Sequence, residues 1–200
     1  LLPKKLPLVP TREMVAFPNV MLSLYLSRPA GILAVEEAMQ SHRLVLLVAQ
    51  RNQDLEDPAP RDMYKVGVIA HVVRALQVPD GRHKILLQGV ARTRIDRCET
   101  HNRMYLAKHT PLKEKEIKKL TREDRNLAES IRENLQILVQ HEHLPEEMLL
   151  VTEEVTDPGV LSDLILAHYK LELGYAQTLL EELDPIKRLR ATNSIIQDDL

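Results

Sequence analysis

Hydrophobic and polar positions alternate with a period of two over much of the first 110 residues, which predicts β-strands. The clearest case is Val66–Arg97, in which two long alternating runs are separated by Pro79-Asp80-Gly81. Proline fixes φ at the first turn position, aspartate tolerates the second, and glycine accepts the left-handed conformation. A hairpin with a three-residue, bulged loop is therefore expected. In such a hairpin Val78 faces Arg82, and the other cross-strand pairs follow from that.

This register divides the side chains of the hairpin between two faces. One face is apolar at its base and is expected to pack on the core: Val73, Ala75, Ile85 and Leu87, with Gln77 and His83 at the tip. The other face mixes aliphatic and cationic side chains: Val72, Arg74, Leu76, Val78, Arg82, Lys84, Leu86 and Gln88. Such a mixture is more typical of an ordinary surface, and the alternative is a groove for apolar peptide segments. Gly67 and Gly89 predict bends or bulges that curl the sheet toward a barrel.

Shorter patterns predict the other elements of this first part. Leu6–Pro10 is interrupted by prolines and is expected to be a short edge strand. The remaining segments are expected to be, in order, a half-buried strand at Leu22–Leu26, a helix with Pro29 in its first turn, a buried strand at Leu44–Ala49, a polar loop at Gln50–Asp62 and a strand at Met104–Thr110.

Near Pro111 the period changes from two to 3.6, which places a boundary between a β subdomain at 1–112 and a helical subdomain at 113–200. Thr121, Asp157 and Asp184 are expected to cap helices, the last two with proline in the first helical turn. The final helix carries a seam at Ile186, Leu189, Asn193, Ile196 and Leu200, a coiled-coil spacing with one polar position. Because the seam still continues at Leu200, we expect the chain to be a segment of a longer protein, and the seam could pair two copies.

Composition excludes several classes of partner. The 200 residues include 27 basic and 29 acidic side chains, a net charge of −2, which directs the chain to neither nucleic acid nor an anionic membrane. There is no Trp, one Phe and five Tyr, so a platform for stacking bases is hard to build. The longest aliphatic run, Leu44–Ala49, is far too short to cross a bilayer. A single cysteine, Cys98, excludes an internal disulfide and favours a reducing compartment, so we expect a cytoplasmic protein.

Candidate chemistry is weak, and the sequence predicts no catalytic, metal or cofactor site. The six glycines never adopt the spacing of a phosphate-binding loop. Cys98 and His101 make only a C-x-x-H in a loop, which indicates an ordinary thiol. His141 and His143 diverge at a helix end and are expected to be solvated, whereas His168 is expected to be a hydrogen-bonded core histidine.

Several stretches together resemble one family in the same order along the chain. They are LPLVPTREMVAFP, SRPAGILAVEEAM, LVLLVAQ, MYKVGVIAHVV, VPDGRHKILLQGVARTRI, DPGVLSDLILAH and LLEELDPIKRL. These stretches are similar to the amino-terminal domain of bacterial Lon, the ATP-dependent AAA+ serine protease. The resemblance implies an α+β fold with a PUA-like, six-stranded β subdomain with one helix, followed by a helical bundle whose last helix leads to the ATPase module. It also implies hexamers, and ATP and Mg in the full-length protein.

The family's ATPase motifs and its Ser-Lys catalytic pair have no counterpart here, so this fragment is expected neither to hydrolyse ATP nor to cut peptides. By resemblance, its function is to recognise exposed hydrophobic segments of unfolded or damaged proteins and to assist assembly. The candidate substrate-binding residues are Leu76, Val78 and Leu86, with Met21 and Leu22 extending the patch. One alternative is a free-standing LON-domain protein that binds a small ligand or a folded regulatory partner. RNA binding is a third hypothesis, which neither charge nor aromatic content supports.

Overall fold

The computed structural model describes residues 2–200, which form two compact units. The first unit comprises the chain up to Leu112 together with Glu172–Leu180, and the second comprises Lys113–Leu171 with Glu181–Leu200. The first boundary lies after residue 112, where the change of period predicts it, but all of residues 113–200 were expected in the helical subdomain. The structure instead places Glu172–Leu180 with the first unit. An amphipathic pattern shows that one face of a helix is buried, but not which core covers it.

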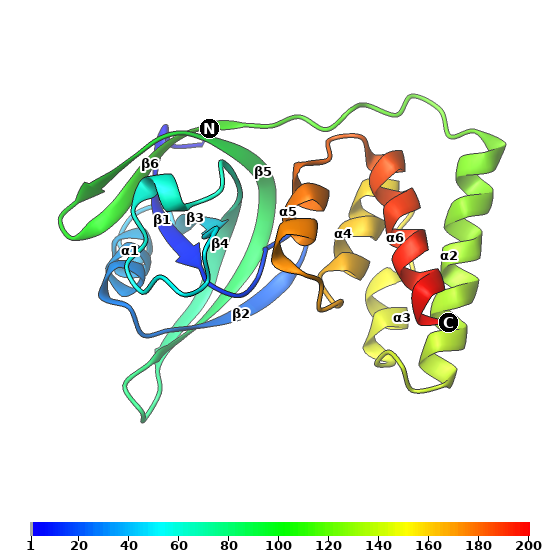
Figure 1. The fold of residues 1–200 in the computed structure, drawn as a ribbon, viewed down its shortest axis with the longest axis horizontal. Helices are drawn as coiled ribbons and strands as arrows, with labels where there is room; N and C mark the ends of the chain where they lie inside the picture. Colours follow the sequence, from blue (N-terminus) through cyan, green and yellow to red (C-terminus); the bar gives the residue numbers. More distant parts are fainter. Residues whose placement is uncertain (1) are drawn as a thin grey trace. The chain divides into compact units, whose positions relative to one another are not determined.

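Six strands build the first unit, as the alternating patterns predicted: β1 (Lys5–Thr11), β2 (Met21–Leu26), β3 (Leu44–Ala49), β4 (Val66–Gln77), β5 (His83–His101) and β6 (Met104–Pro111). Their order is β2-β5-β4-β3-β1-β6, and β5 also pairs with β6, which closes a barrel (Figure 1). β1 and β3 are parallel, and the other pairs are antiparallel. Together with the helices, this confirms the expected α+β class.

β1 lies inside the sheet, so the prediction of an edge strand for Leu6–Pro10 was wrong. Its first half, Lys5–Leu8, pairs with β6, and its second half, Leu8–Thr11, pairs with β3. Pro7 and Pro10 therefore each lie where the ladder runs to one neighbouring strand only. A proline without an N–H is tolerated at such a position because its nitrogen can face the unpaired side.

The core of the first unit lies inside the barrel. It contains fully buried aliphatic side chains from five segments: Leu6, Leu8, Leu46, Val48, Met63, Ile69 and Ala107. Helix α1 (Pro29–Met39) contacts β1 and buries Ala34, Val35 and Ala38. A 3₁₀ turn, η1 (Pro60–Asp62), ends the loop after β3.

Helix α5 (Leu173–Glu181) belongs to this unit as far as Leu180, and specific polar contacts hold it there. The side-chain Nε2 of Gln177 donates to the Val66 carbonyl at 3.0 Å, and Nε of Arg92 donates to the Leu180 carbonyl at 2.7 Å. Arg92 is almost completely buried. Because a buried donor needs an acceptor, these two bonds fix the helix against the strands.

The second unit is a helical bundle of α2 (Arg122–Gln140), α3 (Glu147–Thr152), α4 (Pro158–Leu166) and α6 (Pro185–Asp199). The three predicted caps are confirmed. Thr121 accepts from the amide of Asp124 in a capping box, and Asp157 and Asp184 each accept from two amides of the following turn. The core is aliphatic: Ile131, Leu135, Leu138, Leu144, Met148, Leu161, Ile165, Leu189 and Ile196.

The predicted seam of the last helix packs against other helices of this unit. Leu189 and Ile196 are fully buried and pack in the aliphatic core with residues of α2 and α4. Leu200 is exposed at the end of the seam. The coiled-coil spacing therefore marks the face of α6 that packs in its own bundle, and a seam that pairs two copies is not needed to explain it.

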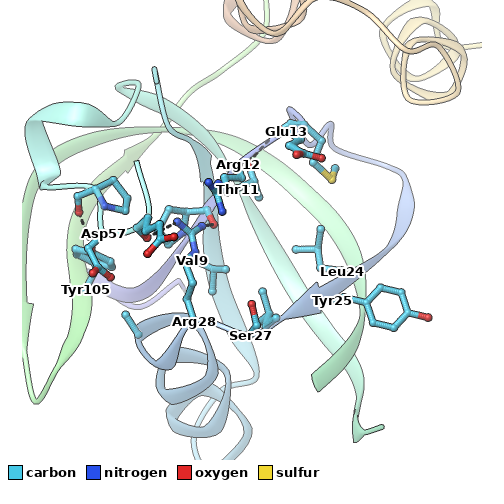
Figure 2. Close-up of a pocket in the computed structure, with 17 residues that line it drawn as sticks. Val9, Thr11, Arg12, Glu13, Leu24, Tyr25, Ser27, Arg28, Asp57 and Tyr105 are labelled. Carbon is cyan, nitrogen blue, oxygen red and sulfur yellow. Dashed lines mark hydrogen bonds between the residues drawn. The ribbon is translucent and has the colours of Figure 1, made fainter. Parts of the chain in front are cut away.

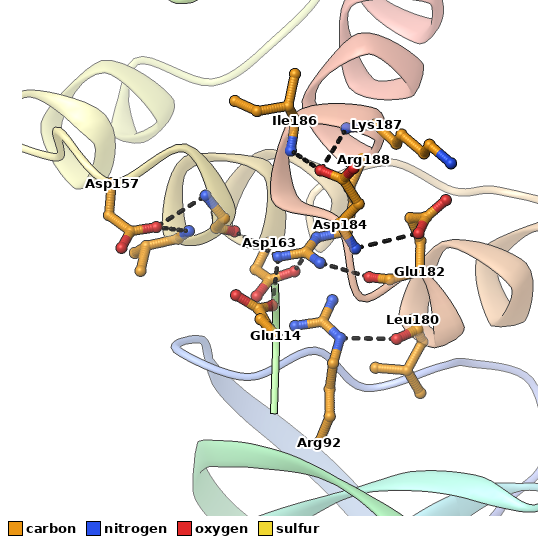
Figure 3. Close-up of polar contacts among 12 residues, drawn as sticks. Arg92, Glu114, Asp157, Asp163, Leu180, Glu182, Asp184, Ile186, Lys187 and Arg188 are labelled. Atoms are coloured by element: carbon orange, nitrogen blue, oxygen red, sulfur yellow. Dashed lines mark hydrogen bonds and ion pairs between the residues drawn. The ribbon is translucent and has the colours of Figure 1, made fainter. Parts of the chain in front are cut away.

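A buried arginine joins four segments of the second unit (Figure 3). The side chain of Arg188 has no exposed surface, and its Nε lies 3.1 Å from Oδ1 of Asp163, which is 1% exposed. A terminal nitrogen of the guanidinium lies 2.6 Å from Oε1 of Glu114 and donates to the Gly159 carbonyl at 3.2 Å. The other terminal nitrogen donates to the Glu182 carbonyl at 2.7 Å. Arg188 thus connects α6 to α4 and to the segments that precede α2 and α6 in the chain.

Candidate functional site

The predicted hairpin forms as its turn residues indicated. The Val78 amide donates to the Arg82 carbonyl at 2.9 Å, and the Gly81 amide donates to the Val78 carbonyl at 3.0 Å. Gly81 has a φ of +91°, the conformation for which glycine was expected. Asp80 accepts from the backbone amide and the side chain of Arg82, and both bonds lower the pKa of Asp80. The loop is thus stabilised by its own polar groups.

A bulge changes which side chains face the core. The register of β4 against β5 shifts between Val72 and Arg74, so that Val72 pairs with Leu87 while Ala75 pairs with Ile85. Val72 is buried and Val73 is 39% exposed. The prediction that placed Val73 on the core face and Val72 on the mixed face was therefore wrong near the base of the hairpin. An inserted residue reverses the alternation, and beyond it the predicted faces are correct.

Strand β2 adds a third strand to the hairpin beside β5. Met21, Ser23 and Tyr25 pair with Gln88, Leu86 and Lys84, whereas Leu22 pairs with the buried Leu87. Paired residues share a face of the sheet. Met21 therefore lies on the same face as Leu76 and Leu86, and Leu22 lies on the opposite face. The prediction that Leu22 extends the patch is wrong on this geometry.

We call this outer surface the hairpin face. It consists of Met21, Ser23, Tyr25, Arg74, Leu76, Val78, Arg82, Lys84, Leu86 and Gln88. Met21, Tyr25 and Leu76 are 50, 51 and 44% exposed, whereas Val78 and Leu86 are partly buried. Three large apolar side chains thus lie on one three-stranded ribbon, which extends beyond the barrel (Figure 1).

The cations of the hairpin face lie next to these apolar side chains. The guanidinium carbon of Arg82 lies 4.5 Å from the centroid of the Tyr25 ring, and Nζ of Lys84 lies 5.8 Å from it. Arg74 is exposed and pairs with Leu86 across the strands. Cations placed over an aromatic ring hold the ring in place while their charge stays in water. The face can therefore contact an apolar segment and attract acidic residues beside it.

The first unit also contains a pocket of about 300 Å³ that sequence reasoning missed. It lies between the ends of β1 and β2, the first turn of α1 and the loop after β3. Figure 2 shows Arg12, Arg28 and Asp57 on one side of it and Leu24 on the other, with the Tyr25 ring pointing away. The apolar wall is formed by Val9, Met14, Leu24 and Leu26.

Arg28 positions the loop that borders this pocket. Its guanidinium donates to Oε1 of Gln50 at 2.9 Å, to the Glu56 carbonyl at 3.1 Å and to the Pro10 carbonyl at 2.8 Å. Tyr105 donates from its hydroxyl to the Pro58 carbonyl in the same loop. Burial, and then the neighbouring charge of Arg12, lower the pKa of Arg28. No local pattern in the sequence indicates this role, because the hydrogen-bond partners of Arg28 are 18 to 28 positions away in the chain.

The histidines that were weighed as candidates occupy solvated positions. His141 and His143 are exposed at the end of α2, and His101 is exposed at the end of β5. His168 is also exposed, and its Nδ1 lies 2.8 Å from the Leu164 carbonyl, so the prediction of a core histidine was wrong. In the described part of the chain, no group of three or more His, Cys, Asp or Glu side chains could hold a metal ion. Within residues 2–200, no helix is both long and apolar enough to cross a membrane.

Cys98 is half-buried on β5, and burial, followed by the charge of Glu99, raises its pKa to about 11. At pH 8 only about one thiol in a thousand would be the reactive thiolate. We therefore expect a thiol-alkylating reagent to label the folded chain at least tenfold more slowly than the urea-unfolded chain at the same pH. The labelled fraction can be followed by mass spectrometry. Equal rates would show that the Cys98 thiol is not suppressed by the fold.

Comparisons with known proteins agree with this architecture. Residues 5–198 match the model of the ATP-dependent protease La (LON) substrate-binding domain. A Lon protease of Aquifex aeolicus is 32% identical over 200 residues, which cover 98% of this chain and 25% of that protein. A Lon protease of Desulfovibrio desulfuricans is 36% identical over 200 residues, which cover all of this chain and 23% of that protein. The chain thus spans about a quarter of the length of these relatives.

A solved structure has the same fold. The N-terminal domain of the Mycobacterium avium complex Lon protease superimposes with a TM-score of 0.78 at 22% identity, covering 98% of this chain and all of that one. The family match extends over both units, from β1 to α6. This chain therefore belongs to the family of LON substrate-binding domains, as the resemblance of its sequence to the Lon amino-terminal domain implied.

Proposed function

We propose that this domain binds exposed hydrophobic segments of unfolded or damaged proteins through the hairpin face, and presents them to the ATP-dependent serine protease of which it forms a part. The observation that carries the proposal is the cluster of Met21, Tyr25 and Leu76, each about half exposed, on one ribbon. A native protein hides its aliphatic segments, so shallow apolar contacts can distinguish an unfolded chain without reading its sequence.

Binding by one domain is expected to be weak. Each aliphatic side chain that becomes buried contributes about 1 to 2 kcal/mol, and two or three of them give an affinity in the micromolar range or weaker. Several tethered copies, as in a hexamer, would raise the apparent affinity without new contacts. In this proposal, peptide cleavage and the requirement for ATP and Mg²⁺ belong to other modules of a Lon protease in the cytoplasm.

The proposal is tested by an NMR titration of the isotope-labelled chain with one model protein in its native and its unfolded form. Shifts are expected for the unfolded form alone, and they should map to Met21, Leu76, Val78 and Leu86. A well-folded domain that shows no shifts with either form would contradict the proposal. The domain would then be interpreted as an assembly element.

Replacement of both Met21 and Leu76 by serine is expected to weaken binding of the unfolded protein about thirtyfold, because each half-exposed side chain contributes about 1 kcal/mol. The melting temperature should hardly change, since neither side chain is buried. Binding can be measured by fluorescence anisotropy. Leu150→Ser is a matched control, because Leu150 is 69% exposed in α3. Equal weakening by the control, or a large loss of stability in the double variant, would oppose the hairpin face as the binding surface.

A further inference from the structure

The pocket beside α1 is lined by two arginines, Arg12 and Arg28, and by the carboxylates of Glu13, Glu56 and Asp57, but among residues 2–200 none of these carboxylates forms an ion pair with either arginine. Among the described residues, Arg28 donates only to neutral oxygens, those of Gln50, Glu56 and Pro10. Arg12 donates from Nε to the Gln53 carbonyl at 2.8 Å, and no ion pair of residues 2–200 includes either arginine. Two guanidinium groups are thus held near each other by main-chain and amide oxygens.

This arrangement favours an anionic ligand on energetic grounds. Arg28 is half-buried, and both the loss of water and the nearby Arg12 disfavour its charge. The charge of Asp57 acts in the opposite direction but does not cancel these effects, so the pKa of Arg28 is lowered. Glu13, Glu56 and Asp57 also line the pocket, but their side chains are exposed and water already solvates their charges. An anion between the two arginines would relieve the repulsion between them. A cation at the exposed carboxylates would gain little, as in other surface ion pairs.

The rest of the pocket selects for a small apolar group. Val9, Leu24 and Leu26 present aliphatic side chains, and Gly31 of the first turn of α1 leaves room above them. A Cβ on Gly31 would lie 3.6 to 3.7 Å from Leu26 and Val9, which is ordinary contact. A volume of about 300 Å³ is at the lower end for ligand pockets, so one or two residues can enter but not a long chain.

We propose that this pocket binds a carboxylate joined to a small aliphatic group, the chemistry that an apolar residue presents at the C-terminus of a polypeptide. The carboxylate lies between Arg12 and Arg28, where guanidinium groups form charge-assisted hydrogen bonds. The aliphatic side chain lies against Leu24 and Leu26. This site shares only Tyr25 with the hairpin face, and the ring of Tyr25 points away from the pocket. Binding here would let the domain recognise the ends of chains as well as their internal apolar segments.

The test uses two hexapeptides that end in leucine, one with a free C-terminal carboxylate and one with a C-terminal amide, titrated into the isotope-labelled chain and followed by NMR. The free acid is expected to shift the resonances of Arg12, Arg28, Ala30 and Gly31, and to bind at least tenfold more tightly than the amide. Equal affinity for the two peptides, or shifts confined to the hairpin face, would overturn the proposal. The variant in which both Met21 and Leu76 are replaced by serine should bind the free acid normally. A negative result for the hairpin face would therefore leave the pocket proposal intact, and the reverse also holds.

Variants and smaller anions complete the test. Arg12→Gln is expected to weaken the free acid about tenfold, whereas Arg61→Gln, an exposed arginine in η1 outside the pocket, should leave its affinity unchanged. Arg28→Lys keeps the charge but loses the planar guanidinium, and should also weaken binding of the free acid. If this variant unfolds the loop, the comparison of Arg12→Gln with Arg61→Gln tests the proposal instead. 4-Methylpentanoate should compete, which would place the determinant in the carboxylate and its aliphatic group. Competition by inorganic phosphate at the same concentration would show a general anion site and overturn the proposal.

Discussion

Replacement of Arg188 by alanine is expected to lower the free energy of unfolding of the second unit by about 3 to 5 kcal/mol, because breaking a buried ion pair is strongly destabilising. The side chain has no exposed surface and forms ion pairs with Asp163 and Glu114. It also donates to the carbonyls of Gly159 and Glu182. Removing the guanidinium therefore takes donors away from one buried carboxylate and from two main-chain carbonyls, and leaves a cavity in addition.

The loss can be measured by urea denaturation, with hydrogen exchange of α4 and α6 to report on the second unit. The melting temperature of this unit should fall by more than about 10 °C. Arg190→Ala is the matched control, because Arg190 is exposed on the same helix and its removal should change stability by less than about 0.5 kcal/mol. The stability of Arg188→Lys should lie between those of Arg188→Ala and Arg190→Ala, since lysine keeps the positive charge but not the planar set of guanidinium donors. A loss of less than about 1 kcal/mol in Arg188→Ala would show that the cluster does not hold the bundle together.

Local signals in the sequence predicted local structure well. The turn at Pro79-Asp80-Gly81 and the caps at Thr121, Asp157 and Asp184 were predicted correctly, because each depends on side chains within three or four positions of one another. The order of strands and helices followed from the periodicity, which reports only whether a face is buried.

The misses share a different cause, because they depend on residues far apart in the chain. The bulge at Val73 carries no glycine to mark it, and it exchanged Val72 and Val73 between the two faces. Arg188 lies outside the predicted seam of the last helix, and its carboxylate partners are at positions 114 and 163. The pocket likewise requires the ends of β1 and β2, the start of α1 and a distant loop to meet. A single sequence carries no signal for such meetings unless a family resemblance supplies one.

Gly67→Ala is expected to destabilise the first unit by about 3 kcal/mol or more, as overpacking of a close-packed site does. A Cβ at this position would lie 2.3 Å from the carbonyl oxygen of Leu47 and 2.9 Å from Cδ2 of Leu46. The oxygen belongs to the backbone of β3, which pairs with β4 at Leu47 and Val68, so it cannot move aside without disturbing the ladder. Gly67 was predicted from the sequence to mark a bend. The structure adds the reason that no side chain fits there.

Gly31→Ala is the matched control for this prediction, because the added Cβ would meet Leu26 and Val9 only at ordinary contact distance. Within α1, alanine should be more stable than glycine by about 0.5 to 1 kcal/mol, since glycine loses more backbone entropy on folding. One added methyl group is thus expected to lower the stability of the first unit at Gly67 and to raise it at Gly31. Thermal denaturation followed by circular dichroism measures both variants. A wild-type melting temperature for Gly67→Ala would contradict the prediction. It would mean that β3 and β4 can separate locally at little cost, and that the barrel is less tightly closed than the contacts of Gly67 indicate.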